Sequence, residues 1–443
     1  MIDVKGMFNA RSVAVVGASA KEGKTGHTIL KNIIDGGYTG KIYPINPKAD
    51  EILGVKCCAD LSEIPGTLDL AVMVVPAAAV PGAMRKAGEK GAKGAIIISG
   101  GFREIGEVEL EAEVMGIAAQ YDMCVVGPNC QGVNYTPNKL CASWPLIDRA
   151  GSMAVVAQSG TIGAAMAGWA AEEQIGISAA VALGNKSGIG EVELLRYFAD
   201  DPATSVIALN VEGVKDGRAF MDAARYAVEK KPVVVLKPGR TARGRQAAES
   251  HTKSIAGSDA VFDAVCRQVG VIRAEGITEF YDYCKLMALL KKPAGNRALV
   301  ITSSGGSGIL ATDTAEGCGV DIHPLGEETK AAVKALIPSH CVVSNPLDLT
   351  GDTGADRYET ALGVALADPE VDMAILIFGD PIPGAYEAVE RLRASTGKPL
   401  VVVYLGGGDV EKEESAKMLT AGIPVFPTPE RAVRAIGALL RVK

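Results

Sequence analysis

The chain of 443 residues has few aromatic side chains, 5% of the total, and four histidines. Its nine cysteines contain no C-x-x-C pair and no cysteine–histidine cluster at zinc spacing, so we expect reduced thiols, most of them in the core, and no metal site. Basic residues do not cluster among aromatic residues, and the net charge is −7. This charge balance argues against nucleic-acid binding.

Long apolar runs are also missing, since none approaches the roughly 20 residues that span a bilayer. The first residues, Met1–Lys5, do not begin like a signal peptide. The chain has 48% hydrophobic residues and 52 glycines, a composition typical of alanine- and valine-rich α/β proteins with parallel sheets. We therefore expect a cytoplasmic α/β protein of roughly two to four domains.

Short strand-like runs alternate with helical stretches, which is the pattern of βα units in parallel sheets. Three domains are predicted, at 1–147, 148–293 and 294–443. A helix is expected over Ile277–Leu290, followed by a linker at Lys291–Gly295 that contains two charges, a proline and a glycine. The expected strands are Ser12–Val16, Lys41–Ile45, Leu70–Val75, Gly94–Ile98, Met123–Val126, Met153–Ala157, Ser178–Leu183, Ser205–Val211, Val233–Leu236 and Arg297–Thr302.

The second and third domains repeat one pattern. Met153–Gly163 and Ala298–Gly308 both read as a strand, a Ser-Gly-rich turn and the start of a helix. Each helix is expected to end before a glycine, Gly176 in the second domain and Gly319 in the third. A duplicated flavodoxin-like unit explains the repeat, and coincidence between two short glycine-rich loops remains the alternative.

The first strand opens like a nucleotide-binding fold, because it leads into the turn Gly17-Ala18-Ser19. The dinucleotide fingerprint G-x-G-x-x-G requires a glycine where Ser19 stands. The second strand ends in Asn46-Pro47-Lys48 rather than in an acidic residue that holds a ribose diol. Both departures argue against NAD. A lysine at this position suits an additional ribose phosphate, as in NADP or at the 3′ position of coenzyme A.

Further loops follow predicted strands at the same edge of this sheet, where ligands bind in parallel α/β sheets. Ordinary βα corners explain many of these glycines and prolines individually, and the common edge follows from the topology. The loops are therefore candidates for lining one ligand crevice. Their candidate residues are Val75, Pro76, Ser99, Gly100, Gly101, Phe102 and Asn129.

A candidate phosphate site follows the first strand of the second domain. Gln158-Ser159-Gly160-Thr161 precedes a helix rich in alanine and glycine, where free N–H groups and the positive end of the helix dipole attract anions. Glu212 directly follows another apolar strand, so we expect it to be partly buried near the same crevice. Its carboxylate can orient a histidine, or it can form a structural salt bridge with Lys237 or Arg240.

His251 lies among small hydroxyl residues, in a segment that no core-packing argument requires. Neutral imidazole can attack phosphorus at physiological pH, and the N–P bond that forms is labile. Taken alone, such a residue is more often a surface histidine. Together with Glu212 and the anion site it indicates phosphoryl transfer. The remaining histidines are assigned to surface or loop positions: His27, His323 and His340.

With these residues in view, the chain resembles the α subunit of NDP-forming acyl-CoA synthetases, the acetate–CoA ligase (ADP-forming) type, which are relatives of succinyl-CoA synthetase. The resemblance covers nearly the whole chain. It rests on eight motifs in order: S-V-A-V-V-G-A-S (12–19), G-Y-T-G-K-I-Y-P-I-N-P-K (37–48), S-G-G-F-R-E (99–104), G-P-N-C-Q-G (127–132), Q-S-G-T (158–161), N-V-E-G (210–213), S-H-T…A-G-S-D (250–259) and N-P-L-D-L-T-G (345–351).

The resemblance implies a Rossmann-like domain that binds coenzyme A, followed by two flavodoxin-like ligase domains. It implies that His251 is phosphorylated and that Glu212 stabilises the phosphohistidine. In the family's reversible reaction, phosphate converts an acyl-CoA to acyl phosphate, which phosphorylates the histidine. The histidine then phosphorylates ADP or GDP, with Mg²⁺, at an ATP-grasp site. We expect that site on a separate β subunit, in an α₂β₂ assembly.

Three departures from the family's usual sequence leave the acyl group and the rate open. Lys253-Ser254-Ile255 replaces G-A-L after the S-H-T motif, where lysine either stiffens the loop or adds a phosphate contact. Ser187–Gly190 lacks the aspartate that commonly follows Gly184–Asn185, and Pro238 stands where a small residue is usual. None of these changes removes a chemical group that the mechanism requires.

Two other functions are weighed against this one. An NADP-dependent oxidoreductase is disfavoured by Ser19 and by the lack of an evident hydride-acceptor site. A coenzyme A sensor or scaffold that has lost catalysis is disfavoured because a pure binding module has no use for both His251 and Glu212.

Overall fold

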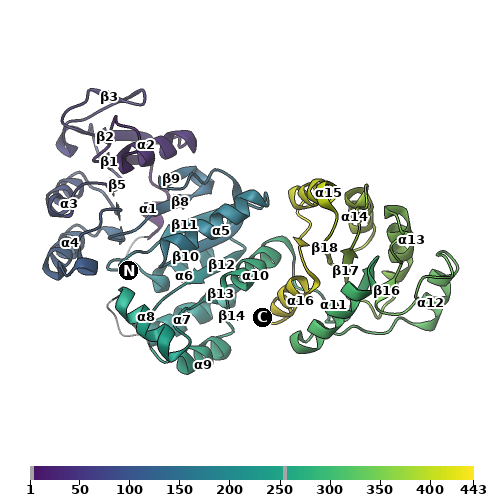
Figure 1. The fold of residues 1–443 in the computed structure, drawn as a ribbon. Coiled ribbons are helices and arrows are strands. Elements are labelled where there is room, and N and C mark those ends of the chain that lie inside the picture. Colours follow the sequence, from purple (N-terminus) through teal and green to yellow (C-terminus); the bar gives the residue numbers. More distant parts are fainter. Residues whose placement is uncertain (1–3, 253–256) are drawn as a thin grey trace. The chain divides into compact units, whose positions relative to one another are not determined.

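The computed structural model describes residues 4–252 and 257–443, and all side chains in these ranges except those of residues 248–252 (Figure 1). The contacts divide the chain into two compact units. The first consists of Met1–Ala171 with Gly176–Arg273, and the second of Glu172–Ile175 with Ala274–Lys443. Within the described residues, no helix combines the length and the apolar character that a membrane span requires.

The first unit begins with a parallel sheet in the order β2-β1-β5-β6-β7. Its central strands are short runs of valine, isoleucine and alanine, buried on both faces as helix-covered parallel strands are. The strands are β1 Ser12–Val16, β2 Lys41–Ile45, β5 Leu70–Met73, β6 Gly94–Ile97 and β7 Cys124–Val126, with a small antiparallel pair, β3 Glu51–Ile52 and β4 Val55–Lys56. The helices are α1 Val4–Phe8, α2 Thr25–Asp35, α3 Val80–Glu89 and α4 Val108–Gln120.

The second sheet of this unit has the order β14-β13-β12-β10-β11-β8-β9. Strands β8 and β9 join it antiparallel, although they precede residue 147, where a domain boundary was expected. The strands are β8 Gly132–Tyr135, β9 Leu140–Ser143, β10 Ala150–Ala157, β11 Ile177–Ala182, β12 Val206–Asn210, β13 Val233–Leu236 and β14 Ile272–Ala274. The helices are α5 Gly160–Glu172, α6 Glu191–Asp200, α7 Gly217–Val228, α8 Ala242–Thr252 and α9 Asp259–Val269.

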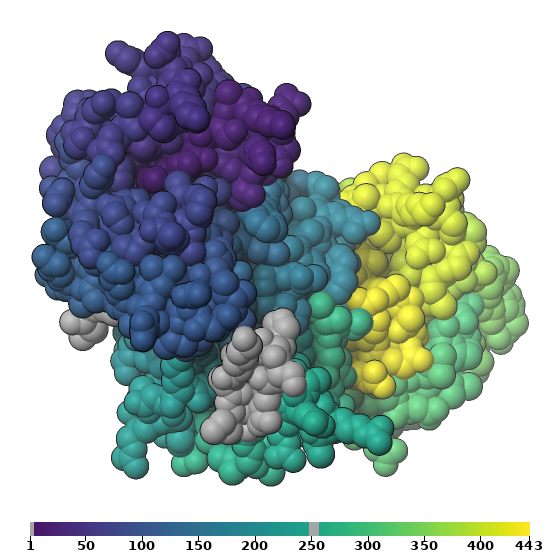
Figure 2. Space-filling model, turned by 60° about the vertical axis from the view of Figure 1, so that its left-hand side comes forward, coloured from purple at the N-terminus to yellow at the C-terminus, as the bar shows by residue number. Residues whose placement is uncertain are grey.

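One hydrophobic core joins the two sheets of the first unit. It contains Val15 of β1 and Val133 of β8 together with Val156 of β10 and Leu209 of β12. The aromatic ring of Phe8 in α1 stacks on Tyr197 in α6, with ring centroids 4.6 Å apart. In Figure 2 the purple and blue residues of the first sheet accordingly lie directly on the blue-teal residues of the second. Loops from both sheets are therefore held in fixed positions relative to one another.

The second unit contains a parallel sheet in the order β16-β15-β17-β18-β19. The strands are β15 Ala298–Thr302, β16 Leu347–Asp348, β17 Met373–Phe378, β18 Leu400–Tyr404 and β19 Val425–Phe426. The helices are α10 Ile277–Leu289, α11 Gly305–Cys318, α12 Glu327–Lys334, α13 Ala355–Ala365, α14 Ala385–Ser395, α15 Gly408–Thr420 and α16 Pro429–Leu440. The expected linker Lys291–Gly295 contains neither helix nor strand, and α10 before it belongs to this unit.

The predicted fold class is confirmed. Each strand expected from the sequence is present, with ends that differ by at most three residues. The strands β10 to β14 and the strands β15 to β19 follow the same order, which in each unit is 2-1-3-4-5, the flavodoxin-like order. The repeat between the second and third predicted domains is therefore a duplicated fold, and not a coincidence between two glycine-rich loops.

The second unit buries one lysine completely. Lys285 Nζ in α10 lies 3.0 Å from a carboxylate oxygen of Glu173 and donates a hydrogen bond to the carbonyl oxygen of Val425 at 2.8 Å. The ammonium also lies 4.3 Å from the centre of the Phe426 ring. Burial lowers the pKa of Lys285, and the charges of Glu173 and Asp282 oppose that effect. The ion pair with Glu173 therefore stabilises the positive charge of Lys285, which is buried away from water.

We expect Glu173→Gln to lower the free energy of unfolding by about 3 kcal/mol, because it leaves a buried ammonium without its counter-charge. Lys285→Met in the same chain should restore most of the loss, since methionine fills similar volume without a charge. Urea unfolding of the full chain measures both effects. A double variant as unstable as Glu173→Gln alone would show that the ion pair is not the cause.

Candidate active site

The connections of the second sheet reverse direction between β10 and β12. From β10 the chain moves to β11 on one side, and from β12 it moves to β13 on the other, so that right-handed crossovers place their helices on opposite faces. A crevice opens between two such loops at the carboxyl ends of the strands. The loops of this sheet are Gln158–Thr161 and Val211–Lys215, which contain the predicted phosphate-binding residues and Glu212.

Hydrogen bonds hold these two loops against each other. The side-chain oxygen of Gln158 accepts the N–H of Glu212 at 3.0 Å. The side-chain oxygen of Asn210 accepts the N–H of Ser159 at 3.2 Å, and the N–H of Gln158 donates to the carbonyl oxygen of Asn210 at 2.9 Å. Glu212 itself is half-buried, as expected. Its backbone is thus fixed beside the start of α5.

Helix α5 begins at Gly160 and has no acidic residue in its first turn. The first N–H groups of a helix have no partner within it and carry its partial positive charge, so this end attracts anions. A Cβ at position 160 would lie 2.5 Å from the side-chain carbonyl carbon of Gln131, so a larger residue there would require Gln131 to move. Gly160 therefore lets the side chain of Gln131 come close to the start of the helix.

A cavity of about 720 Å³ lies above these loops, within the first unit. It is lined from both sheets, so it contains residues that are distant in sequence. The predicted residues Gln158, Ser159, Gly160, Thr161, Glu212 and Asn129 all line it. Its further walls come from Ile98, Arg103, Glu104, Cys130, Gln131, Trp144, Ala182, Gly184, Asn185, Lys186, Gly213, Val214 and Lys215.

The loops predicted to bind coenzyme A lie at the carboxyl ends of β1, β2 and β5. Gly17 has a φ of +91°, and a Cβ there would lie 2.4 Å from the carbonyl oxygen of Val74, so only glycine fits the turn. The amide of Asn46 donates to the carbonyl oxygen of Ala18 at 2.8 Å, and its side-chain oxygen accepts the N–H of Lys48 at 2.8 Å. Asn46 therefore joins two of the loops, while the side chain of Lys48 is exposed.

Several side chains predicted at this edge serve the loop structure. The hydroxyl of Ser99 donates to the carbonyl oxygen of Val75 at 2.5 Å, which joins the loops after β5 and β6. Phe102 is fully buried in the core of the first sheet. The side chain of Phe102 is therefore not exposed to a ligand, and its part in binding coenzyme A would be confined to its backbone.

The expectation that His27 lies at the surface is wrong. His27 is 7% exposed in α2, because it falls on the apolar face of that helix with Leu30. Its Nδ1 lies 3.0 Å from the carbonyl oxygen of Ser19 and donates to it. This bond fixes the turn after β1. His323 is half-buried and His340 is exposed, and both lie in irregular segments, as expected.

His251 lies in the last turn of α8, which begins a few residues after β13 at the same edge of the second sheet. Its side chain is outside the described residues, and so is the segment Lys253–Ile255. Lys237, at the end of β13, is buried, which lowers its pKa. Helix α8, which contains His251, and the loop that contains Glu212 thus follow neighbouring strands of the second sheet, β13 and β12. The pairing of His251 with the carboxylate of Glu212 stays a prediction.

Three cations that the sequence did not single out as site residues line the cavity. Arg103 pairs with the buried carboxylate of Glu111 at 2.6 Å, and Lys186 pairs with Glu191 at 2.8 Å. The ammonium of Lys215 donates to the carbonyl oxygen of Lys186 at 2.7 Å and forms no ion pair with the described carboxylates. Burial lowers the pKa of Lys215, and the positive charges of Arg103 and Lys186 add to this effect.

The sequence contained a signal for the two lysines, because each follows a strand at the carboxyl edge that also carries Glu212, whereas Arg103 follows β6 of the first sheet. Lys215 stands three residues after Glu212, and Lys186 follows Gly184–Asn185. An anion in the cavity would meet these charges as well as the start of α5. Within the described residues, no group of three or more histidine, cysteine or acidic side chains is placed to hold a metal ion.

Three family models match the chain in succession. A CoA binding domain matches residues 11–136, a succinyl-CoA ligase like flavodoxin domain matches residues 150–287, and a Ligase-CoA domain matches residues 298–442. The first match agrees with the expectation that this sheet is not a dinucleotide site. The third lies within the second unit and covers its whole sheet.

Relatives match over the whole length. The α subunit of acetate–CoA ligase (ADP-forming) I from Pyrococcus furiosus is 42% identical, with 99% of this chain and 98% of the relative covered. Acetate–CoA ligase (ADP-forming) I from Archaeoglobus fulgidus is 39% identical over 98% of this chain, which spans 63% of that longer protein. A solved chain of dinucleotide-forming acetyl-coenzyme A synthetase 1 from Ca. Korarchaeum cryptofilum, in complex with phosphate and ADP, is 37% identical. It has a TM-score of 0.94, with 100% of this chain and 97% of that chain covered.

The order of the matched domains, the strand orders of the sheets and the end-to-end matches agree with the eight sequence motifs. The chain therefore belongs to the α subunits of the ADP-forming acetate–CoA ligase family.

Proposed function

We propose that this chain catalyses the acyl- and phosphoryl-transfer steps by which an acyl-CoA, phosphate and ADP or GDP are converted reversibly to a carboxylic acid, coenzyme A and ATP or GTP. The observation that carries the proposal is the 720 Å³ cavity, where the anion-attracting start of α5 meets Glu212 and loops of the CoA-binding sheet. Three functional parts, 1–147, 148–293 and 294–443, divide the work. The first binds coenzyme A and the second holds the transferred phosphoryl group.

Coenzyme A binds at the carboxyl edge of the first sheet. The turn Gly17–Ser19 and the loop Asn46–Lys48 hold its nucleotide end, and the 3′-phosphate meets the exposed ammonium of Lys48. Its pantetheine arm follows the loops at Val75–Pro76 and Ser99–Phe102. The thioester then reaches the cavity at Asn129, which lines it.

The acyl-transfer step takes place at the start of α5. An oxygen of hydrogen phosphate attacks the thioester carbon, the new C–O bond forms as the C–S bond breaks, and the thiolate takes the proton of the phosphate. The products are acyl phosphate and coenzyme A. The N–H groups of Gly160 and Thr161 hold the phosphate, and Lys215, which borders the cavity, supplies a positive charge.

The phosphoryl-transfer step requires His251. A neutral ring nitrogen attacks the phosphorus of the acyl phosphate, the P–O bond to the acyl group breaks, and a carboxylate leaves. Glu212 accepts a hydrogen bond from the other ring nitrogen, so it fixes the tautomer and stabilises the positive charge of the phosphorylated ring. Glu212 is suited to this role because its backbone is held by Gln158 while its side chain borders the cavity.

A partner subunit completes the reaction. The chain is similar over 99% of its length to a P. furiosus protein that is named as an α subunit. This likeness supports a separate β subunit with an ATP-grasp site, which binds the nucleotide with Mg²⁺ and accepts the phosphoryl group from His251. An α₂β₂ assembly follows from the same resemblance. A coenzyme A sensor without catalysis is the alternative, and the histidine variant separates the two.

Lys48→Ala should weaken binding of coenzyme A about tenfold, the effect of losing one charged hydrogen bond to the 3′-phosphate. Binding of 3′-dephospho-coenzyme A should be unchanged. Lys41→Ala is the matched control, because Lys41 is exposed at the opposite end of the same strand. Calorimetric titration of both ligands checks the prediction, and an equal loss for both ligands would contradict a phosphate contact.

His251→Ala should abolish acid-labile phosphorylation of the chain by acyl phosphate, as measured by intact mass. It should leave the conversion of acyl phosphate and coenzyme A to acyl-CoA and phosphate unchanged, because that step does not use the histidine. His340→Ala serves as the control, since His340 is exposed and lies in the second unit. Wild-type chain that binds coenzyme A but shows neither reaction would instead support the sensor.

Glu212→Gln should slow phosphorylation of His251 about 100-fold and spare acyl transfer. The substitution keeps the backbone bond to Gln158, so the loop should stay in place. An equal loss of phosphorylation and of acyl transfer in Glu212→Gln would show that Glu212 acts only on the fold.

A further inference from the structure

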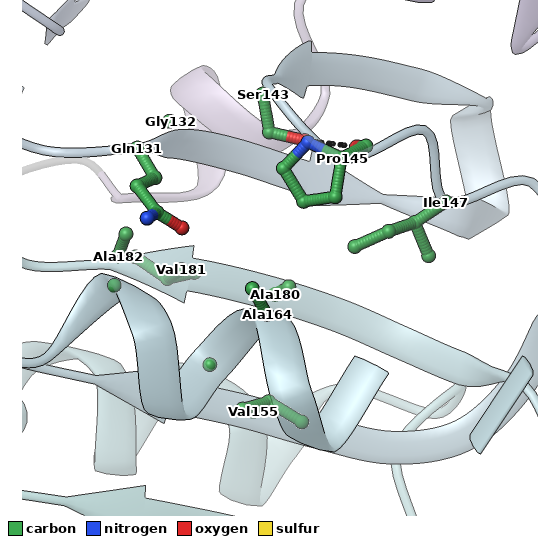
Figure 3. A pocket seen from close by; sticks show the side chains of 12 residues that line it. Gln131, Gly132, Ser143, Pro145, Ile147, Val155, Ala164, Ala180, Val181 and Ala182 are labelled. Carbon is green, nitrogen blue, oxygen red and sulfur yellow. Dashed lines mark hydrogen bonds between the residues drawn. The ribbon is translucent and has the colours of Figure 1, made fainter. Parts of the chain in front are cut away.

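A second, smaller pocket opens beside the start of α5 (Figure 3). Its walls are almost entirely apolar, with Val155 on β10, Ala164 on α5, Ala180 on β11, and Pro145 and Ile147 on the segment after β9. It encloses about 20 Å³. One water-sized group needs about 10–15 Å³ by the same measure, so the pocket has room for one or two small groups.

The small pocket is next to the large cavity. Three residues line both: Gln131, Gly160 and Ala182. Figure 3 shows Gln131 and Ile147 at opposite ends of the small pocket, with Pro145 between them and the alanines of β11 and α5 below. A group held at the N–H of Gly160 therefore lies at the border between a charged space and an apolar one.

We propose that this pocket receives the hydrocarbon end of the acyl group and restricts the enzyme to short acyl chains. The proposal rests on the proposed function, since it takes the phosphate to be bound at Gly160. The carbonyl carbon must then lie within bonding distance of that phosphate. Its alkyl group gains free energy only where it leaves water for an apolar surface. The small pocket offers a mostly apolar surface directly beside Gly160, whereas the walls of the large cavity mix apolar residues such as Trp144 with Glu212 and Lys215.

The size of the pocket is set by a wall that is held in place. The amide of Asn134, which is fully buried, donates to the carbonyl oxygen of Ile147 at 2.9 Å. The hydroxyl of Ser143 donates to the carbonyl oxygen of Pro145 at 2.9 Å. These bonds fix the backbone from which the Ile147 side chain projects. The opposite wall consists of alanines on one face of β11, which cannot retreat.

Ile147 is thus the residue that limits the length of the acyl chain. An acetyl methyl group fits the pocket and an ethyl group fills it, whereas a propyl group or an aromatic ring would overlap Ile147. Val155, a residue of β10, forms another wall of the pocket and is 1% exposed, because it is packed in the sheet. Ile147 is half-buried, so it can be shortened without opening the core.

The test uses the full chain and measures the rate at which acetyl, propionyl and butyryl phosphate each react with coenzyme A to form the thioester. Wild type should prefer acetyl phosphate. In Ile147→Ala the ratio of kcat/KM for butyryl over acetyl phosphate should rise about tenfold or more, since one methylene in a pocket is worth that much. Leu146→Ala is the matched control, because Leu146 is the neighbouring residue, is 45% exposed and does not line the pocket.

A second variant works in the opposite direction. Ala164→Val should fill the pocket and reduce kcat/KM for propionyl phosphate more than for acetyl phosphate, with coenzyme A affinity unchanged. If wild type transfers acyl groups but neither Ile147→Ala nor Ala164→Val changes the ratios of kcat/KM between acyl phosphates, the pocket assignment is overturned. The proposed function would then still stand. A wild-type chain that transfers no acyl group would overturn both. An Ile147→Ala chain that does not fold leaves the decision to Ala164→Val.

Discussion

The carboxylate of Glu111 on α4 joins the two sides of the candidate site. It is 1% exposed, yet it accepts hydrogen bonds from Asn185 at 3.0 Å and Ser187 at 2.6 Å and forms an ion pair with Arg103 at 2.6 Å. A buried carboxylate is tolerated only when donors surround it. Because these donors come from loops of both sheets, the cavity between the sheets keeps its shape only while Glu111 is satisfied by all of them. The position of the Arg103 guanidinium at the cavity wall depends on the same contact.

The repeated strand order explains how a single fold serves several binding tasks. In all three large sheets the loops at the switch point leave from adjacent strands, so their polar groups meet. In the second sheet the side chain of Gln158 accepts the N–H of Glu212, and in the third sheet the side chain of Ser303 accepts the N–H of Gly379 at 3.0 Å. The second and third sheets are thus stabilised at the same place, the loops of the switch point, by the same kind of side-chain to backbone hydrogen bond. The two sheets share a strand order and differ in the residues of these loops.

The sequence predicted ten strands that are all present, because β-branched runs are local signals, whereas binding at the two sheet edges stays a prediction. It did not predict β8 and β9, since their short runs around Asn134 and Cys141 are polar or mixed and β8 pairs with a strand distant in sequence, where Asn134 lies opposite Ala180. It also missed Lys186 and Lys215. Both follow strands of the second sheet at the edge that carries Glu212, but their position beside the cavity depends on the order of the strands, which the residues near each lysine do not determine. The burial of His27 was missed although the residue lies on the apolar face of α2 with Leu30, because a polar side chain on that face was not taken as part of the core.

In the proposed function, the cavity and the small pocket bind the two ends of one substrate, which differ in their solvation. An acyl phosphate is charged at one end and apolar at the other, and its reactive bonds lie between them. Burial and the charges of Arg103 and Lys186 lower the pKa of Lys215, and Glu111 and Glu191 oppose that effect, so an anion bound beside Lys215 would help to stabilise its charged form. The apolar pocket gives no such gain to a charge, but it excludes water from the alkyl end. A substrate that satisfies both surfaces must place its carbonyl carbon at Gly160, and orientation of this kind accounts for much of the rate of acyl transfer.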